Sequence, residues 1–317
     1  MKRQGGDNAF LGRTPYGTQN EATYAGARSF MRRRYSRNLD GIDVAVTGIP
    51  FDLATTNRPG ARFGPEGVRR ASAQLAWGPL WPWGFDPFDV LAVVDYGDCQ
   101  FDFGRPQNVP DEIEAHAKTV IDTGTSLLSL GGDHFVTYPL LRAHAETYGP
   151  LALVHFDAHS DTWRDEDGRV DHGTMFFHAA QQGIVDPAKS VQTGIRTHND
   201  ETHGFTVLDA GFVHRNGTDA VIAEIRRVVG DGPAYLTFDI DCLDPSCAPG
   251  TGTPVVGGLS TLQAQEILRG LGDIDFVAMD LVEVAPIYDI GEITALAGAT
   301  LALEYLCLRA ARKTSDG

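Results

Sequence analysis

Residues 151–161 read LALVHFDAHSD, an apolar run followed directly by three side chains of types that bind metal ions. The run Leu151–Phe156 is almost entirely apolar, which is typical of a strand buried on both faces of a parallel sheet. Side chains of an extended chain alternate, so Asp157, His159 and Asp161 are expected to point to the same side. Carboxylates at the end of a buried strand are costly without a positive partner, and the segment contains no Lys or Arg. A bound cation is the simplest explanation.

Two other segments repeat this arrangement. GGDH (131–134) follows the apolar run Ser126–Leu130, and DID (239–241) follows Ala234–Phe238. The three segments together predict a two-metal site with the ligands His134, Asp157, His159, Asp161, Asp239 and Asp241. We expect one ion among His134, Asp157, Asp161 and Asp239, and the other among His159, Asp241 and the shared Asp157 and Asp239. Taken singly, each segment would be an ordinary turn. Three such segments, each at the end of a predicted strand, are difficult to explain by coincidence.

The ligand types restrict the metal. Zinc prefers fewer ligands that are richer in nitrogen or sulfur, and magnesium rarely accepts imidazole, so an oxygen-rich set with two imidazoles favours two manganese(II) ions per subunit. Cobalt or zinc could substitute. Paired ions lower the pKa of a bridging water, which then supplies hydroxide at neutral pH.

The rest of the chain predicts an α/β fold. Apolar, β-branched runs alternate with segments of helical spacing, which indicates a parallel sheet covered by helices. We predict eight strands, at 43–48, 90–95, 126–130, 151–156, 190–195, 206–208, 234–238 and 276–284. We predict helices at 65–75, 110–122, 139–147, 219–229, 260–271 and 292–311. No linker interrupts this pattern, so residues 41–317 are expected to form a single domain after an N-terminal extension, residues 1–40.

The amino-acid composition limits the classes of binding partner. Acidic residues outnumber basic ones by 42 to 26, giving a formal charge of −16, which argues against nucleic acid and anionic membranes and favours a small cation. Solubility alone could also explain the charge. The four cysteines form no Cys-x-x-Cys pair, and no apolar stretch reaches the length of a membrane span, so a cytoplasmic protein is expected. The basic stretch Arg28–Tyr35 is interpreted as part of an extension that packs on the domain or on a neighbouring subunit.

A family resemblance adds to this interpretation. The strings GGDH (131–134), FDAHSD (156–161), DHGTMF (171–176), FDIDCLDP (238–245), APGTGTP (248–254) and EVAP (283–286) resemble the ureohydrolase (arginase/agmatinase) family over about residues 43–311, and within it the bacterial agmatinases most. The resemblance implies a three-layer α/β/α fold with a central eight-stranded parallel sheet. It also implies two manganese ions, hydrolysis of a guanidinium group to urea and an amine, and a homotrimer or homohexamer.

The resemblance also assigns roles outside the ligand set. His172 would be the proton shuttle, although a histidine hydrogen-bonded beneath a loop is the alternative. Glu283 would pair with the guanidinium at two points, because a carboxylate matches a planar donor fork. Asp161 would accept a hydrogen bond from the attacking hydroxide, and Thr253 would shape the substrate pocket.

The substrate expected is agmatine, which would yield urea and putrescine. The segment 162–171 lacks the pattern with which arginases hold an amino acid, and its acidic residues, with Asp200 and Glu201, disfavour a carboxylate tail. Guanidinobutyrate or guanidinopropionate is the alternative and would need a cation such as Arg58 or Arg62. An arginase, a two-metal phosphoesterase and a non-catalytic metal-binding homologue are further alternatives.

Overall fold

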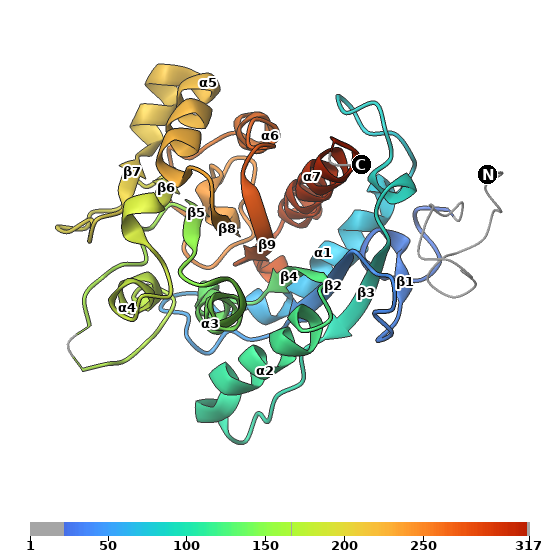
Figure 1. Ribbon diagram of the computed structural model, residues 1–317, viewed down its shortest axis with the longest axis horizontal. Coiled ribbons are helices and arrows are strands. Elements are labelled where there is room, and N and C mark those ends of the chain that lie inside the picture. Colours follow the sequence, from blue (N-terminus) through green and yellow to red (C-terminus); the bar gives the residue numbers. More distant parts are fainter. Residues whose placement is uncertain (1–21, 166, 316–317) are drawn as a thin grey trace.

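The computed structural model describes residues 22–165 and 167–315, and these form a central sheet of nine parallel strands between two layers of helices (Figure 1). The strand order is β1-β3-β2-β4-β9-β8-β5-β6-β7. The strands are β1 (Arg34–Tyr35), β2 (Val44–Ile49), β3 (Val93–Asp98), β4 (Ser126–Gly131), β5 (Ala152–Phe156), β6 (Val191–Thr193), β7 (Thr206–Leu208), β8 (Pro233–Asp239) and β9 (Asp275–Val282). The predicted three-layer α/β/α class is confirmed. The predicted count of eight strands is one short, because β1 adds an edge strand.

Alternate strand residues build two separate cores. Val46, Leu128 and Val154 face one helical layer, whereas Ala45, Leu127 and Leu153 face the other. The first layer contains α1 (Gly64–Ser72), α5 (Ala210–Val229), α6 (Thr261–Arg269) and α7 (Ile293–Ser315), and the second contains α2 (Val109–Ile121), α3 (Thr137–Tyr148) and α4 (Met175–Gln181) (Figure 1). The 3₁₀ helices span Phe30–Arg32, Ala61–Phe63, Ala73–Leu75, Pro87–Asp89, Pro106–Asn108, His134–Val136, Pro187–Lys189, Ile240–Cys242 and Pro286–Tyr288.

The six predicted helices are present, and two details differ. Helix α4 was not predicted. Helix α5 begins at Ala210 rather than at residue 219 and passes through Gly217, whose φ of 79° locally interrupts the helical backbone. Ser260 caps α6 with a reciprocal pair of bonds to Gln263, as a capping box does.

The basic stretch near the N-terminus packs on the domain. Phe30 donates its backbone N–H to Asp95 at 2.7 Å, and the guanidinium of Arg33 lies 4.1 Å from the centre of the Phe88 ring. Arg32 and Arg33 are buried. The first 21 residues of the predicted extension, and Glu166 of the acidic segment, lie outside the described residues.

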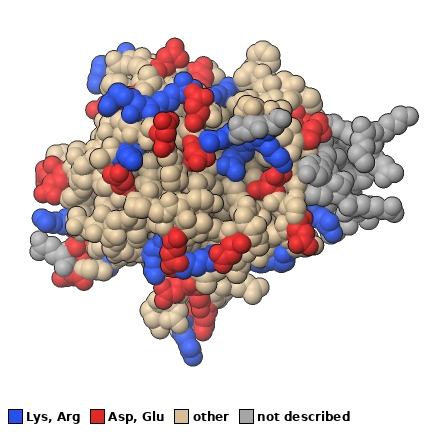
Figure 2. All heavy atoms as spheres, viewed as in Figure 1, with Lys and Arg blue, Asp and Glu red and all other residues tan. Residues whose placement is uncertain are grey.

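Two surface properties bear on partners. Helix α7 is the one described helix that is long and apolar enough to cross a membrane, but 78% of its apolar window is buried in the protein, as in a core helix. On the face drawn in Figure 2, basic side chains lie among acidic ones rather than in one continuous basic area.

Strand order places the predicted ligands together. β4, β9, β8 and β5 are consecutive neighbours in the sheet, and the segments with His134, Glu283, Asp239 and Asp157 follow their carboxyl ends. Ligands of parallel α/β sheets bind at this edge.

Candidate active site

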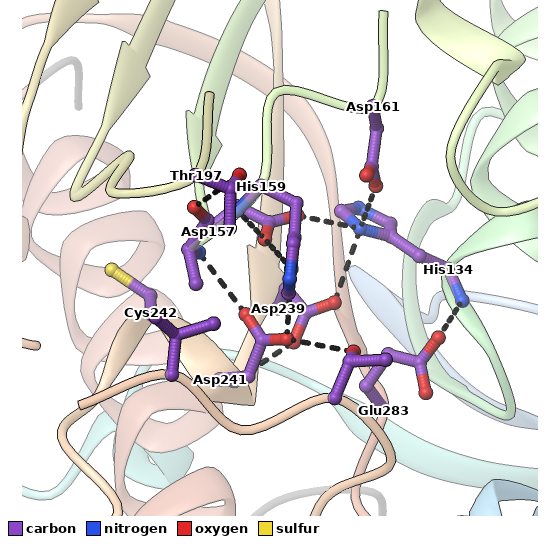
Figure 3. Close-up of polar contacts among 12 residues, drawn as sticks. His134, Asp157, His159, Asp161, Thr197, Asp239, Asp241, Cys242 and Glu283 are labelled. Atoms are coloured by element: carbon purple, nitrogen blue, oxygen red, sulfur yellow. Dashed lines mark hydrogen bonds and ion pairs between the residues drawn. The ribbon is translucent and has the colours of Figure 1, made fainter. Parts of the chain in front are cut away.

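The first group of side chains surrounds His134. Its Nδ1 lies 3.0 Å from Asp157 Oδ2, 2.9 Å from Asp161 Oδ2 and 3.2 Å from Asp239 Oδ2 (Figure 3). All four side chains are buried. One imidazole N–H can satisfy only one of three acceptors, so a proton on Nδ1 does not complete this arrangement.

The second group surrounds His159. Its Nδ1 lies 3.1 Å from Asp241 Oδ2 and 3.3 Å from Asp157 Oδ1 (Figure 3). Asp157 therefore directs one oxygen to each group. Asp239 contacts the first group through Oδ2, while its Oδ1 accepts the backbone N–H of Asp241 at 2.8 Å.

The spacing of these atoms fits divalent cations. Neighbouring donors around an octahedral ion with ligand bonds of ~2.1 Å lie ~3 Å apart, and the contacts above range from 2.9 to 3.3 Å. The shifted pKa values also indicate that positive charge stabilises this group of side chains. Although burial opposes it, the three aspartates raise the pKa of His134 well above its usual value, and Asp241 with Asp157 raises that of His159 to about 12. Burial and the neighbouring Asp241 and Asp157 raise the pKa of Asp239 well above its usual value. A metal ion would replace those protons.

Glycine lets the GGDH turn form. A Cβ on Gly132 would lie 1.6 Å from the carbonyl oxygen of Phe51, so no side chain fits there. Gly132 accepts the backbone N–H of Glu283 at 2.8 Å, and Asp133 donates its N–H to Phe51. The turn thus joins the end of β4 to the end of β9 and to the loop after β2.

Sequence reasoning missed His155 as a neighbour of the site. His155 Nε2 lies 2.8 Å from Asp157 Oδ2, and its Nδ1 accepts a hydrogen bond from the Gln192 amide at 3.1 Å. The Gln192 contact places the ring proton on Nε2, which therefore donates to Asp157. The period-two alternation that aligned Asp157 with His159 could have included His155, which was interpreted as part of the apolar run.

Glu283 and His172 form a second polar unit beside the ligands. Glu283 Oε1 accepts the His134 backbone N–H and a hydrogen bond from His172 Nδ1, both at 2.9 Å (Figure 3 shows the first). Glu283 Oε2 is buried and has no hydrogen-bond partner among the described residues. The expected two-point pairing thus has one free oxygen available.

His172 is held by partners that favour different protonation states. Thr56 donates its backbone N–H to His172 Nε2 at 2.9 Å, which requires the lone pair of a neutral ring. Burial also disfavours the imidazolium, but the hydrogen bond and charge of Glu283 raise the pKa of His172 to about 9. This ring can therefore both hold and release a proton near neutral pH.

A pocket of about 290 Å³ opens beside these groups. It is lined by Thr56, His159, Asp161, Trp163, Asp171, His172, Gly173, Thr174, Asp239 and Thr253. Thr253 also donates to Asp241 Oδ2 at 3.1 Å. The lining contains no Lys or Arg. Arg62 is paired with Asp52 instead, and Arg58 donates to the carbonyl oxygen of Thr251 at 2.6 Å.

Comparison with known proteins gives consistent matches. The arginase family matches residues 42–307. An agmatinase of Chromobacterium violaceum is 59% identical over 312 residues, which cover 98% of this chain and 97% of that protein. The crystal structure of a hypothetical agmatinase from Burkholderia thailandensis is similar with a TM-score of 0.97 at 56% identity, covering 98% of this chain and 100% of its own. The proclavaminate amidinohydrolase of Streptomyces clavuligerus is similar with a TM-score of 0.87 at 40% identity, covering 92% of this chain and 100% of its own.

Proposed function

The chain belongs to the arginase family and is an agmatinase-type ureohydrolase, and on that premise we propose that it hydrolyses agmatine to urea and putrescine with two Mn²⁺ ions. The family match and the agmatinase relatives also confirm the resemblance predicted from its motifs.

The unpaired oxygen of Glu283 carries the substrate proposal. A buried carboxylate oxygen without a donor is costly, and a guanidinium N–H supplies a charge-assisted donor of the right type. Gly252 borders this oxygen, because a Cβ there would lie 3.5 Å from Glu283 Oε2. A planar group can therefore approach where a side chain would crowd it.

The ligand groups described above would hold the two ions. When bound, such a pair supplies hydroxide from water at neutral pH and polarises the substrate. Asp161 accepts a hydrogen bond from the attacking nucleophile and orients it. Glu283 accepts hydrogen bonds from the guanidinium N–H groups, which holds the guanidinium carbon beside the nucleophile.

His172 supplies the proton for the departing amine. An alkylamine leaves readily only if its nitrogen is protonated as the C–N bond breaks. Because Glu283 occupies Nδ1, proton exchange with the pocket takes place at Nε2, which lies 2.7 Å from the Thr56 hydroxyl. The contact with Glu283 raises the pKa of His172 and so favours uptake of a proton, which at Nε2 would displace the hydrogen bond from the Thr56 N–H.

The pocket lining supports a cationic tail. Asp171 lies in the lining, and Trp163 adds an aromatic wall whose ring centre is 6.2 Å from that of His159. Cations are attracted to both kinds of group. A guanidino acid would need a cation for its carboxylate, and the two candidates, Arg58 and Arg62, are engaged elsewhere.

A urea-release assay tests the proposal. The protein is stripped of metal, loaded with Mn²⁺, and given agmatine, arginine, guanidinobutyrate and guanidinopropionate in parallel. Agmatine should have the highest kcat/KM, with putrescine formed in equal amount to urea. Faster hydrolysis of arginine or of either guanidino acid would contradict the substrate assignment and leave the site assignment intact. A trimeric or hexameric assembly in the cytoplasm remains our prediction, and the mass of the native protein in solution tests the assembly.

A further inference from the structure

A chain of buried polar groups lies behind His134. His134 Nε2 is 2.9 Å from Thr237 Oγ1, which is 2.6 Å from Asp280 Oδ1, and Tyr235 Oη is 2.9 Å from Asp280 Oδ2. Thr237 and Tyr235 lie on β8, and Asp280 lies opposite Thr237 on β9. All four residues have an exposed fraction of 0%. Polar groups at the centre of a parallel sheet must be paired, and here they pair with one another.

The hydrogen bonds in this chain have a defined direction. Two hydroxyl groups donate to Asp280, one to each oxygen, as they do to a carboxylate. Thr237 has only one proton, and that proton goes to Asp280, so the Thr237 oxygen can only accept from His134 Nε2. An imidazole with its proton on Nε2 has its lone pair on Nδ1. Nδ1 is the atom that faces Asp157, Asp161 and Asp239.

We propose that Thr237 and Asp280 are positioning residues that fix the tautomer and the ring orientation of His134, so that Nδ1 is presented as a metal ligand. The inference rests on the metal-dependent function proposed above, and it concerns ion binding rather than the choice of substrate. Neither residue is part of the pocket lining. Second partners of this kind orient histidine ligands and increase their basicity.

Three single variants separate positioning from simple packing. Thr237→Val keeps the shape of the side chain and removes the acceptor, whereas Thr237→Ser keeps the hydroxyl. Tyr235→Phe removes the hydrogen bond at the far end of the chain but leaves the link between Thr237 and His134. Each variant is stripped of metal, and its Mn²⁺ affinity and stoichiometry are measured by calorimetric titration, together with the Tm of the metal-free protein.

The expected result is specific to one ion. Thr237→Val should weaken binding at the His134 site by about 10- to 100-fold, and Thr237→Ser should bind like the unchanged protein. Tyr235→Phe should lower the Tm of the metal-free protein and retain the Mn²⁺ affinity. If Thr237→Val does not fold, Thr237→Cys should show the same loss to a smaller extent, because sulfur is a weak acceptor.

Two results would overturn the inference. One is unchanged Mn²⁺ affinity in Thr237→Val or, failing that, Thr237→Cys. The other is a loss that follows the fall in Tm equally in Tyr235→Phe, which would indicate packing alone. Because the titration needs no substrate, failure to hydrolyse agmatine would refute the substrate proposal while leaving this inference testable.

Discussion

Replacing Glu283 with Gln tests the guanidinium contact with almost no change in shape. Glu283 Oε1 accepts two hydrogen bonds, from the His134 backbone N–H and from His172 Nδ1. A glutamine can keep both only by placing its carbonyl oxygen in that position. Its NH₂ group then occupies the position of Oε2, where it directs donors at a substrate group that itself consists of donors.

The magnitude follows from this geometry. Losing a charge-assisted hydrogen bond costs about 1.5–3 kcal/mol, and facing donors add about 1–2 kcal/mol for the groups left unpaired. The expected loss of transition-state stabilisation is thus about 2.5–5 kcal/mol, or a factor of about 10² to 5 × 10³ in kcat/KM for agmatine. Both ions should remain, because the ligand side chains are unchanged.

The assay combines urea release with metal content. Glu292→Gln serves as the control, since Glu292 is partly exposed and pairs with Arg70, and it should retain the original kcat/KM. Activity of Glu283→Gln within tenfold of the unchanged protein, with both ions present, would refute the role given to Glu283. Loss of an ion from this variant would show instead that Glu283 acts through His134.

Three further changes have expected outcomes. His172→Asn should lower kcat by about 10²–10⁴ and retain both ions, as measured by steady-state kinetics and metal analysis; loss of metal would mean that its role is misassigned. Asp157→Ala should remove both ions and abolish activity, because its two oxygens face the two groups; retained activity would contradict the bridging role. Burial lowers the pKa of His144 to about 4, so between pH 6.5 and 4 the unfolded state gains a proton that the folded state does not, and the free energy of unfolding falls by up to about 3 kcal/mol. His144→Phe should reduce this loss in urea unfolding of the metal-free protein between pH 7 and pH 5, and the same change at the exposed His198 should not; equal pH dependence in both variants would contradict the assignment.

The sequence predicts strands where the residues are apolar enough to indicate burial. Most of the eight expected strands are apolar over most of their length, because helices cover both faces of the sheet. β1 has no apolar pattern of this kind. Arg34 and Tyr35 are both exposed, and the strand forms through backbone pairing with β3. A two-residue edge strand therefore leaves no periodic signal.

Missed helical segments have a similar cause. α4 is seven residues long and has no side-chain cap, and its start is held by a hydrogen bond from the Phe176 N–H to the Asp161 carbonyl oxygen. The predicted start of α5 at residue 219 is wrong: the helix begins at Ala210, and Gly217 interrupts its backbone before the helix resumes. A tertiary contact decides the first case, whereas the start of α5 is fixed locally, because the Asp209 side chain accepts the Phe212 N–H as an N-cap.

The candidate site could also be predicted only in part. Residue type and spacing predicted which side chains converge, since each follows the end of a strand. The adjacency of β4, β9, β8 and β5 is a long-range property, which no local pattern contains. The partners behind the ligands were missed altogether, because Thr237, Asp280 and His155 sit inside runs interpreted only as core.

Charge balance connects the metal site to the substrate class. In the proposed metal site, the four aspartates Asp157, Asp161, Asp239 and Asp241 would carry the negative charge that two divalent ions neutralise. Asp133 and Glu283 are further buried carboxylates near them, and the contacts of Glu283 with the His134 N–H and His172 leave Oε2 unpaired. A guanidinium brings charge-assisted N–H donors to that oxygen, whereas a neutral amide brings weaker ones. With metal bound and substrate absent, the unpaired Glu283 carboxylate oxygen would be unfavourable. Glu283 therefore favours binding of a cationic substrate over neutral analogues of the same shape.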